Sequence, residues 1–178
     1  MRIENPGQPP VILQNLTINF KLSELKSKFP ASGSNPSTPD SKPSAASPST
    51  PRLLLVDDQK MNLAVLKALV KRIGGFETET AADGREALQR LQNADAPAFD
   101  AVLTDMWMPE LDGEGLAKAI HDDARLAYLP VYVITADVEL EDTYAEKGFD
   151  SIILKPVTMD TLGPLLVGIA ERRKGEVE

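Results

Sequence analysis

Apolar and polar residues alternate along residues 52–174 in two rhythms. Short runs of four to six residues, most of them continuously apolar, predict buried strands, and the alternating run at 76–81 predicts a strand near a sheet edge. Between these runs, apolar residues recur every three or four positions, as they do along one face of a helix. Strands are expected at 52–56, 76–81, 101–104, 131–135 and 151–154, and helices at about 61–73, 83–92, 113–123, 138–147 and 159–173.

The strict alternation of five strands with five helices predicts an α/β fold, a doubly wound five-stranded parallel sheet. Crossovers between parallel strands are right-handed, and their helices cover both faces of such a sheet. In the first helix the apolar side chains are expected to form one stripe against the sheet; these are Met61, Val65, Leu66, Leu69, Val70 and Ile73.

The last helix carries two conflicting signals at its start. Thr158 is a suitable N-cap, which predicts a helix that begins at Met159. Pro164 is unfavourable inside a helix because it lacks a backbone N–H, which predicts a start nearer Gly163.

Two segments precede this compact domain. Residues 31–51 consist almost wholly of Ser, Thr, Pro, Ala and Gly, without a large apolar side chain, and are expected to form a flexible linker. Within residues 1–30, apolar and polar residues alternate from Leu16 to Leu22, which predicts one strand. Because a lone strand is unstable in water, it needs a sheet from elsewhere. We interpret 1–30 as part of a neighbouring domain, with docking on a partner as the alternative.

Charge and composition exclude several classes of protein. The net charge of −8 and the lack of a basic cluster argue against a nucleic-acid-binding surface. The chain has no cysteine, which excludes disulfides, thiolate zinc sites and thiol catalysis. The start of the chain does not resemble a signal peptide, and the longest apolar window, 162–170, is too short to span a bilayer. We therefore expect a soluble, cytoplasmic protein without membrane contact.

Four of the five predicted strands end in, or are followed directly by, acidic, hydroxyl or ammonium side chains, which can bind ligands or take part in a reaction. Asp57 and Asp58 follow the first strand, Asp105 the third, Thr135 stands at the end of the fourth, and Lys155 follows the fifth. Each of these residues alone is best explained as a turn or capping residue. In a doubly wound sheet, however, the carboxyl ends of the strands meet at one edge, and ligands bind there.

Three carboxylates at one edge repel one another strongly, and a single lysine cannot neutralise them. A divalent cation removes this repulsion, and oxygen ligands without histidine or cysteine favour Mg²⁺. Magnesium beside a carboxylate, a hydroxyl and an ammonium group is an arrangement suited to phosphoryl transfer. Asp105, on the central strand, is the expected nucleophile and would form an acyl phosphate.

Four stretches of the domain resemble the receiver domain of two-component response regulators: LLLVDDQKMNLAVLKALV, AVLTDMWMPELDG, VYVITA and IILKP. The resemblance covers about residues 52–172. It implies a strand order of 2-1-3-4-5 and a magnesium-dependent reaction in which Asp105 takes a phosphoryl group from a phosphohistidine. It also implies a histidine kinase or a histidine phosphotransfer protein as the partner. Whether phosphorylation produces a homodimer is left open.

The resemblance also implies a set of metal ligands. Asp58 and Asp105 would bind Mg²⁺ directly, Asp57 mostly through water, and Trp107 through its backbone carbonyl. The turn after the acceptor would be shaped by Met108, Pro109, Asp112 and Gly113.

Two further residues would contact the phosphoryl group itself. Thr135 would donate a hydrogen bond to it and shift towards it, and Lys155 would pair with it. A cis peptide bond before Pro156 would aim this lysine.

The family usually has an aromatic residue at the position of Ile152, which turns inwards when the threonine moves. An isoleucine cannot make this ring movement, so the coupling to an output surface is left open.

Three other positions complete the comparison with the family. Trp107 is bulky for a position beside an acyl phosphate, and we predict that it shields the phosphoryl group from water; contact with a partner is the alternative. Ala136 is small and leaves access for a donor histidine. His121, the only histidine, is interpreted as a surface residue of a helix.

Three other functions fit the residues less well. An aspartyl phosphatase of the haloacid dehalogenase type needs a second aspartate two residues after the nucleophile, where this chain has Trp107. A flavodoxin-like cofactor module needs a hydroxyl-rich loop after the first strand, where this chain has the acidic DDQKMN. A degenerate receiver that only binds partners would not need the complete set of site residues. We therefore predict a domain that is not an enzyme towards other substrates.

The order of strand, linker and receiver resembles the C-terminal end of a hybrid sensor kinase, with LTINFKL similar to the closing strand of the ATP-binding domain. Only KGEVE follows the last helix, so output is expected by protein contact or onward transfer rather than through an effector domain. A stand-alone regulator with an N-terminal tail is the alternative. Histidine kinase activity would belong to upstream domains, and the receiver would then be the cytoplasmic portion of a membrane-bound kinase.

Overall fold

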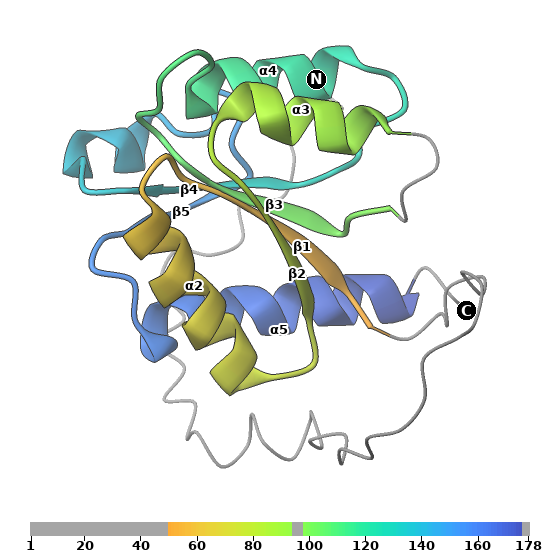
Figure 1. Cartoon of the computed structure of the whole chain (residues 1–178), viewed down its shortest axis with the longest axis vertical. Coiled ribbons are helices and arrows are strands. Elements are labelled where there is room, and N and C mark those ends of the chain that lie inside the picture. The colour runs from red at the N-terminus through yellow and green to blue at the C-terminus, as the bar shows by residue number, and fades with distance from the viewer. Residues whose placement is uncertain (1–49, 94–97, 176–178) are drawn as a thin grey trace, which may run out of the picture.

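The structure is a computed structural model that describes residues 50–93 and 98–175 (Figure 1). The strand predicted within 1–30 and almost all of the linker predicted at 31–51 lie outside the described residues. The described part of the chain forms a five-stranded parallel sheet of order β2-β1-β3-β4-β5, so the predicted fold class and strand order are confirmed. The edge position predicted for the second strand is also correct.

The strands and helices lie close to their predicted positions. The strands are β1 Arg52–Val56, β2 Glu77–Ala81, β3 Ala101–Asp105, β4 Val131–Thr135 and β5 Ser151–Leu154. The α-helices are α2 Lys60–Ile73, α3 Gly84–Gln92, α4 Gly113–Asp122 and α5 Met159–Gly175, and η1 Val138–Asp142 is a 3-10 helix.

Two layers of helices cover the two faces of the sheet. Helices α2 and α5 lie on one face, and α3, α4 and η1 lie on the other (Figure 1). Neighbouring residues of β1 point to opposite faces, so Leu53 and Leu55 join one core cluster and Leu54 and Val56 the other. This double coverage explains why the central strands are continuously apolar. Among the described residues, no helix has the length and apolarity needed to cross a bilayer.

The predicted stripe on α2 is wrong at two positions. Met61 and Val65 were expected to face the sheet, yet they are 75% and 50% exposed. The buried residues of this helix are Leu66, Val70 and Ile73. Each residue turns a helix by about 100°, so Met61 and Val65 lie roughly 140° and 100° around the axis from Leu66. Met61 and Val65 are four residues apart, so they lie in the same row on α2, and this row faces solvent.

The segment 138–147, predicted to be a helix, contains no α-helix. Val138–Asp142 form the 3-10 helix η1, and turns continue to Gly148, which has a φ of 86°. Within η1 only Leu140 is buried, so a longer α-helix would gain little from packing. Asp137 caps η1 by accepting a hydrogen bond from Glu139 N, which favours a short element.

The last helix begins at Met159, and the later start that Pro164 suggested is wrong. Thr158 caps it as predicted, because its Oγ1 accepts a hydrogen bond from Thr161 N at 3.3 Å. Pro164 lies inside the helix on its exposed side. The helix tolerates the missing N–H because Leu162 and Leu166, on either side of the proline, are fully buried against the sheet.

Candidate functional site

Three carboxylates meet where β1 and β3 end. Each of Asp57, Asp58 and Asp105 offers one oxygen atom, and these atoms lie within 4.8 Å of one another. Asp57 and Asp105 are buried, with 5% and 7% of their surface exposed, whereas Asp58 is exposed. The sheet brings them together because β1 and β3 are parallel neighbours, with Val56 opposite Thr104. The predicted convergence of the three acids is therefore present.

Lys155 completes this pocket from the end of β5. Its Nζ donates a hydrogen bond to Asp105 Oδ1 at 2.8 Å and lies 3.7 Å from Asp57 Oδ2. The side chain of Lys155 is 30% exposed, so it is partly accessible to solvent beside the buried acids. The peptide bond between Lys155 and Pro156 is cis, as predicted.

Asp57 is held by two residues that the sequence interpretation did not include. Gln59 N donates to Asp57 Oδ1 at 2.8 Å, and Asn62 Nδ2 lies 3.0 Å from both carboxylate oxygens. Burial raises the pKa of the Asp57 carboxyl above its usual value; these hydrogen bonds lower it, the charge of Asp105 raises it, and that of Lys155 lowers it. The sequence feature that could have indicated Asn62 is its place as a polar residue in the first turn of the helix that follows Asp57 and Asp58.

Thr135 lies at the end of β4, next to β3 in the sheet, and is 2% exposed. Its Oγ1 accepts a hydrogen bond from Asp137 N at 3.1 Å. The threonine hydroxyl is therefore linked to the backbone at the start of η1. A hydroxyl can accept this bond and still donate its own proton to another group.

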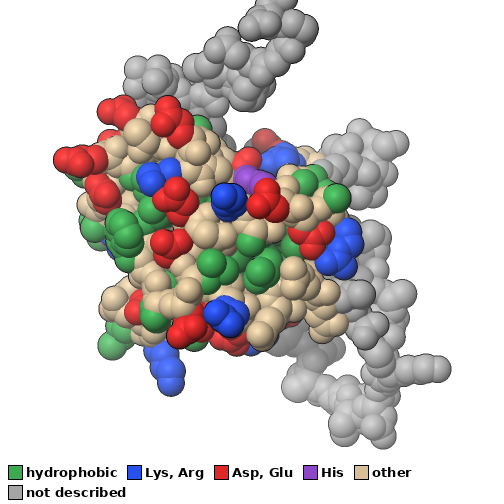
Figure 2. Space-filling model, turned by 90° about the horizontal axis from the view of Figure 1, so that it is seen from above, with side chains coloured by type: hydrophobic (Ala, Val, Ile, Leu, Met, Phe, Trp, Pro, Cys, Tyr) green, Lys and Arg blue, Asp and Glu red, His purple; other side chains and the backbone are tan. Residues whose placement is uncertain are grey.

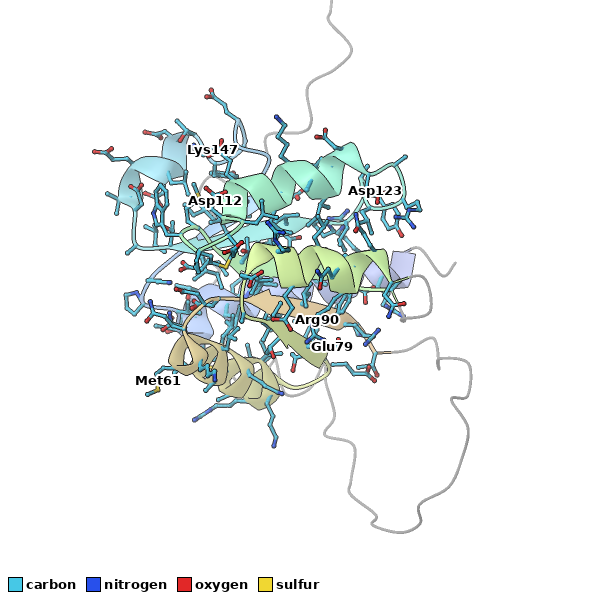
Figure 3. The ribbon with its side chains drawn as sticks, turned by 45° about the horizontal axis from the view of Figure 1, so that its top comes forward. Met61, Glu79, Arg90, Asp112, Asp123 and Lys147 are labelled. Atoms are coloured by element: carbon cyan, nitrogen blue, oxygen red, sulfur yellow. The ribbon has the colours of Figure 1, made fainter. Side chains whose placement is uncertain are left out.

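The loop after Asp105 is fixed by short backbone contacts. Gly113 N donates to Met106 O at 2.9 Å, and Glu110 has a φ of 64°, in the left-handed region. Asp112, labelled in Figure 3, caps α4 by accepting a hydrogen bond from Gly115 N at 2.8 Å. A Cβ on Gly113 would lie 2.5 Å from the carbonyl oxygen of Asp105, so only glycine fits at this position.

The exposure of four other residues that the sequence interpretation singled out can now be given. Trp107 is 64% exposed, and Ala136 is exposed directly after Thr135. Ile152 is half-buried and packs against the core cluster under α3 and α4. His121 is exposed on α4, as the surface interpretation predicted.

The donor chemistry of the pocket fits a hard divalent cation. Its ligand groups are carboxylate oxygens, with no cysteine in the chain and the only histidine on α4. Two of the three acids are buried, where uncompensated negative charge is costly. Oxygen donors of this kind suit Mg²⁺, which also keeps part of its water shell.

Comparisons with known proteins agree with this geometry. A family model described as the response regulator receiver domain matches residues 53–166. The chain is 38% identical over 123 residues to the chemotaxis protein CheY-3 of Vibrio cholerae, covering 68% of this chain and 92% of that protein. It is 32% identical over 126 residues to the chemotaxis protein CheY of Pseudomonas aeruginosa, covering 70% and 99%.

Solved structures show the same fold. The chemotaxis response regulator CheY4 of Vibrio cholerae has a TM-score of 0.60 at 29% identity, covering 67% of this chain and 98% of that chain. The signal receiver domain of a signal transduction histidine kinase from Syntrophus aciditrophicus has a TM-score of 0.61 at 27% identity, covering 68% and 91%. The chain therefore belongs to the response regulator receiver family, whose domains accept a phosphoryl group on an aspartate in two-component signalling.

Proposed function

We propose that Asp105 is the residue that accepts the phosphoryl group. The observation that carries this proposal is the pairing of the buried Asp105 carboxylate with Lys155, 2.8 Å away, beside two further carboxylates. A carboxylate oxygen of Asp105 attacks the phosphorus atom of a phosphohistidine, and the phosphorus–nitrogen bond breaks as the new P–O bond forms. The imidazole leaves with the electron pair of the broken bond, and the product is an acyl phosphate.

The neighbouring residues stabilise the charge that moves in this step. Lys155, freed from its bond to the unmodified carboxylate, pairs with an oxygen of the phosphoryl group, and Thr135 donates a hydrogen bond to another. Asp57, Asp58, Asp105 and the backbone carbonyl of Trp107 would hold Mg²⁺, which supplies positive charge next to the phosphoryl oxygens when it is bound. The three carboxylates within 4.8 Å support this ligand set.

The proposal includes the way in which the domain acts. It catalyses only its own phosphorylation and dephosphorylation, because Trp107 stands where an aspartyl phosphatase would need its second acid. Its partner is a histidine kinase or a histidine phosphotransfer protein, and the phosphorylated domain signals by protein contact or by passing the group on. We place it in the cytoplasm, where ATP-dependent histidine kinases are phosphorylated.

The surroundings of the domain are a further proposal. A solved relative at 27% identity is the receiver domain of a histidine kinase, which supports an arrangement in which residues 1–30 belong to an upstream kinase domain and 31–51 to a linker before the receiver at 52–174. The chemotaxis relatives, of which 92% and 99% are covered, keep the stand-alone regulator as the second candidate.

The test uses a small phosphodonor. The full chain is incubated with acetyl phosphate and Mg²⁺, and its intact mass is measured. We expect the mass of one phosphoryl group to be added, and no addition for Asp105→Asn or when Mg²⁺ is removed with a chelator. Phosphorylation of Asp105→Asn to the same extent as the unmodified chain would refute the assignment of Asp105.

A further inference from the structure

The carboxylate of Asp57 is held on both of its oxygens by the protein itself. Oδ1 accepts a hydrogen bond from Gln59 N at 2.8 Å, and Asn62 Nδ2 lies 3.0 Å from Oδ1 and from Oδ2. A carboxylate accepts at about four positions, roughly two on each oxygen. Those on Oδ1 are therefore occupied, and Oδ2, which lies 3.7 Å from Lys155 Nζ, keeps room for a further partner.

The other two acids of the pocket are held less closely. Asp105 uses one oxygen to accept a hydrogen bond from Lys155 Nζ at 2.8 Å. In the described part of the chain, Asp58 makes no hydrogen bond or ion pair, and its side chain is exposed. Of the three carboxylates, Asp57 is therefore the one that other residues hold on both oxygens.

Asn62 can orient this carboxylate without neutralising it. Its amide is an uncharged donor, whereas a lysine or arginine at the same place would cancel negative charge that attracts a cation. Asn62 is half-buried in the first turn of α2, and the side chain of Gln59, at the N-cap, makes no capping hydrogen bond. The start of α2 is thus connected to Asp57 by the amide of Asn62 and the backbone of Gln59.

Mg²⁺ and Ca²⁺ require different things of such a carboxylate. Mg²⁺ is small, keeps several of its waters and binds few carboxylate oxygens, whereas Ca²⁺ takes about 6–8 oxygens in a flexible geometry and accepts both oxygens of one carboxylate. A carboxylate that offers a single oxygen therefore suits Mg²⁺. If Asp57 were free to turn, it could offer both oxygens, which suits Ca²⁺.

We infer that Asn62 is a positioning residue of the cation site: by holding both oxygens of Asp57, it keeps this carboxylate from binding a cation with both, and so makes the pocket prefer Mg²⁺ to Ca²⁺. The inference rests on the proposed function, because it concerns the ligand set proposed there. A contact that only anchored the start of α2 would leave this preference unchanged, so the two roles are separable by experiment.

The test measures cation binding to the full chain without a phosphodonor. The fluorescence of Trp107, the single tryptophan, is titrated with magnesium chloride and, separately, with calcium chloride. The unmodified chain should bind Mg²⁺ more tightly than Ca²⁺. In Asn62→Leu, which is similar in size but has no donor, we expect the Kd for Mg²⁺ to rise about tenfold, as is typical when a residue that holds a metal ligand is lost. The Kd for Ca²⁺ should change by less than about twofold, because the freed carboxylate can add its second oxygen.

Two further variants assign this change to the amide of Asn62. Asn62→Ala also lacks the amide, and alanine has a high helix propensity, so this variant should lose the preference for Mg²⁺ as well. Gln89→Leu removes a side-chain amide from an exposed position of α3 and should keep the preference. Helix α3 lies on the other side of the sheet from α2, on the face of the molecule that Figure 2 shows.

Three outcomes would overturn the inference while leaving the proposed function intact. The first is an unchanged ratio of the two Kd values in Asn62→Leu and Asn62→Ala, and the second is weaker binding of Mg²⁺ and Ca²⁺ by the same factor. The third is an equal change of the ratio in Gln89→Leu. Failure of the unmodified chain to bind Mg²⁺ at all would instead refute the proposed cation site itself.

Discussion

At the scale of single residues, the site depends on a balance of charge among four side chains. Asp57 and Asp105 are buried next to each other, and Lys155 contacts both. Burial opposes the charged form of Asp57, while Gln59 N–H and the Asn62 amide favour it. One ammonium group leaves the three acids with excess negative charge, which is the condition that favours a cation.

Lys155→Ala separates metal binding from catalysis. The three carboxylates remain, so the variant should still bind Mg²⁺; its phosphorylation by acetyl phosphate should be on the order of a hundredfold slower, because a preorganised charge next to the phosphoryl group is lost. Fluorescence of the single tryptophan, Trp107, measures metal binding, and intact mass measures phosphorylation. Lys118→Ala, at an exposed position of α4, is the matched control. An unchanged phosphorylation rate in Lys155→Ala would remove the lysine from the mechanism.

Trp107→Ala tests whether the indole protects the acyl phosphate. Trp107 lies two residues after Asp105, and its side chain is 64% exposed. We therefore expect it to cover a phosphoryl group on Asp105 from the solvent side. We predict faster decay of phospho-Asp105, on the order of a few-fold, because water gains access. The decay of the phosphorylated mass after removal of acetyl phosphate gives this rate. Identical decay in both proteins would support the partner-contact interpretation of Trp107 instead.

Residues at strand ends were predictable, and those that reach back from a helix were not. A parallel sheet brings the ends of its strands to one edge whatever their separation along the chain, so Asp105 and Lys155, 50 residues apart, could be placed at the same edge in advance. Asn62 lies within a helix, and its direction towards Asp57 depends on how α2 is rotated. The same rotation turned Met61 and Val65 to solvent against the prediction.

Among the elements, the junction of β3 and α4 holds Asp105 in place. Gly113 begins α4 and packs against the backbone of Asp105, while Gly113 N binds Met106 O. Asp112, the last residue of the loop, caps α4 by accepting a hydrogen bond from Gly115 N, which connects the loop to the helix. The geometry leaves no room for a side chain at Gly113.

Gly113→Ala should therefore destabilise the domain. Its Cβ would lie 2.5 Å from Asp105 O and 3.2 Å from Met106 Cα, both backbone atoms, and the resulting shift should cost about 1–3 kcal/mol. Gly168→Ala in α5 is the control, because its Cβ meets nothing within 4 Å; it should stabilise the domain by about 0.5–1 kcal/mol. Urea unfolding measures both changes. Equal stability of Gly113→Ala and the unmodified chain would contradict the close contact.

The elements also show why one helix was predicted too long. The segment 138–147 has apolar residues at helical spacing, but the structure buries only Leu140 within η1. Asp137, Glu139 and the acids that follow favour local caps and repel one another, so little remains to stabilise an α-helix. Periodicity indicated that a helical element exists there, and only the packing decided its length.

In the molecule as a whole, two apolar cores stabilise the sheet, and the reactive groups lie together at one edge of it. The sheet is packed on both faces by separate apolar clusters, which fixes the positions of the strand ends. The reactive groups then lie at the carboxyl ends of four strands, β1, β3, β4 and β5. Rigid strands, followed by short loops at their carboxyl ends, are suited to hold charged groups at close distances.

The most direct measurement locates the modified residue. The full chain is phosphorylated with acetyl phosphate and Mg²⁺, the acyl phosphate is reduced with borohydride, and peptide masses show which aspartate has become homoserine. We expect homoserine at position 105 and none without Mg²⁺. Homoserine at position 57 or 58, or an unmodified Asp105 in a folded chain that has bound Mg²⁺, would contradict the assignment of Asp105.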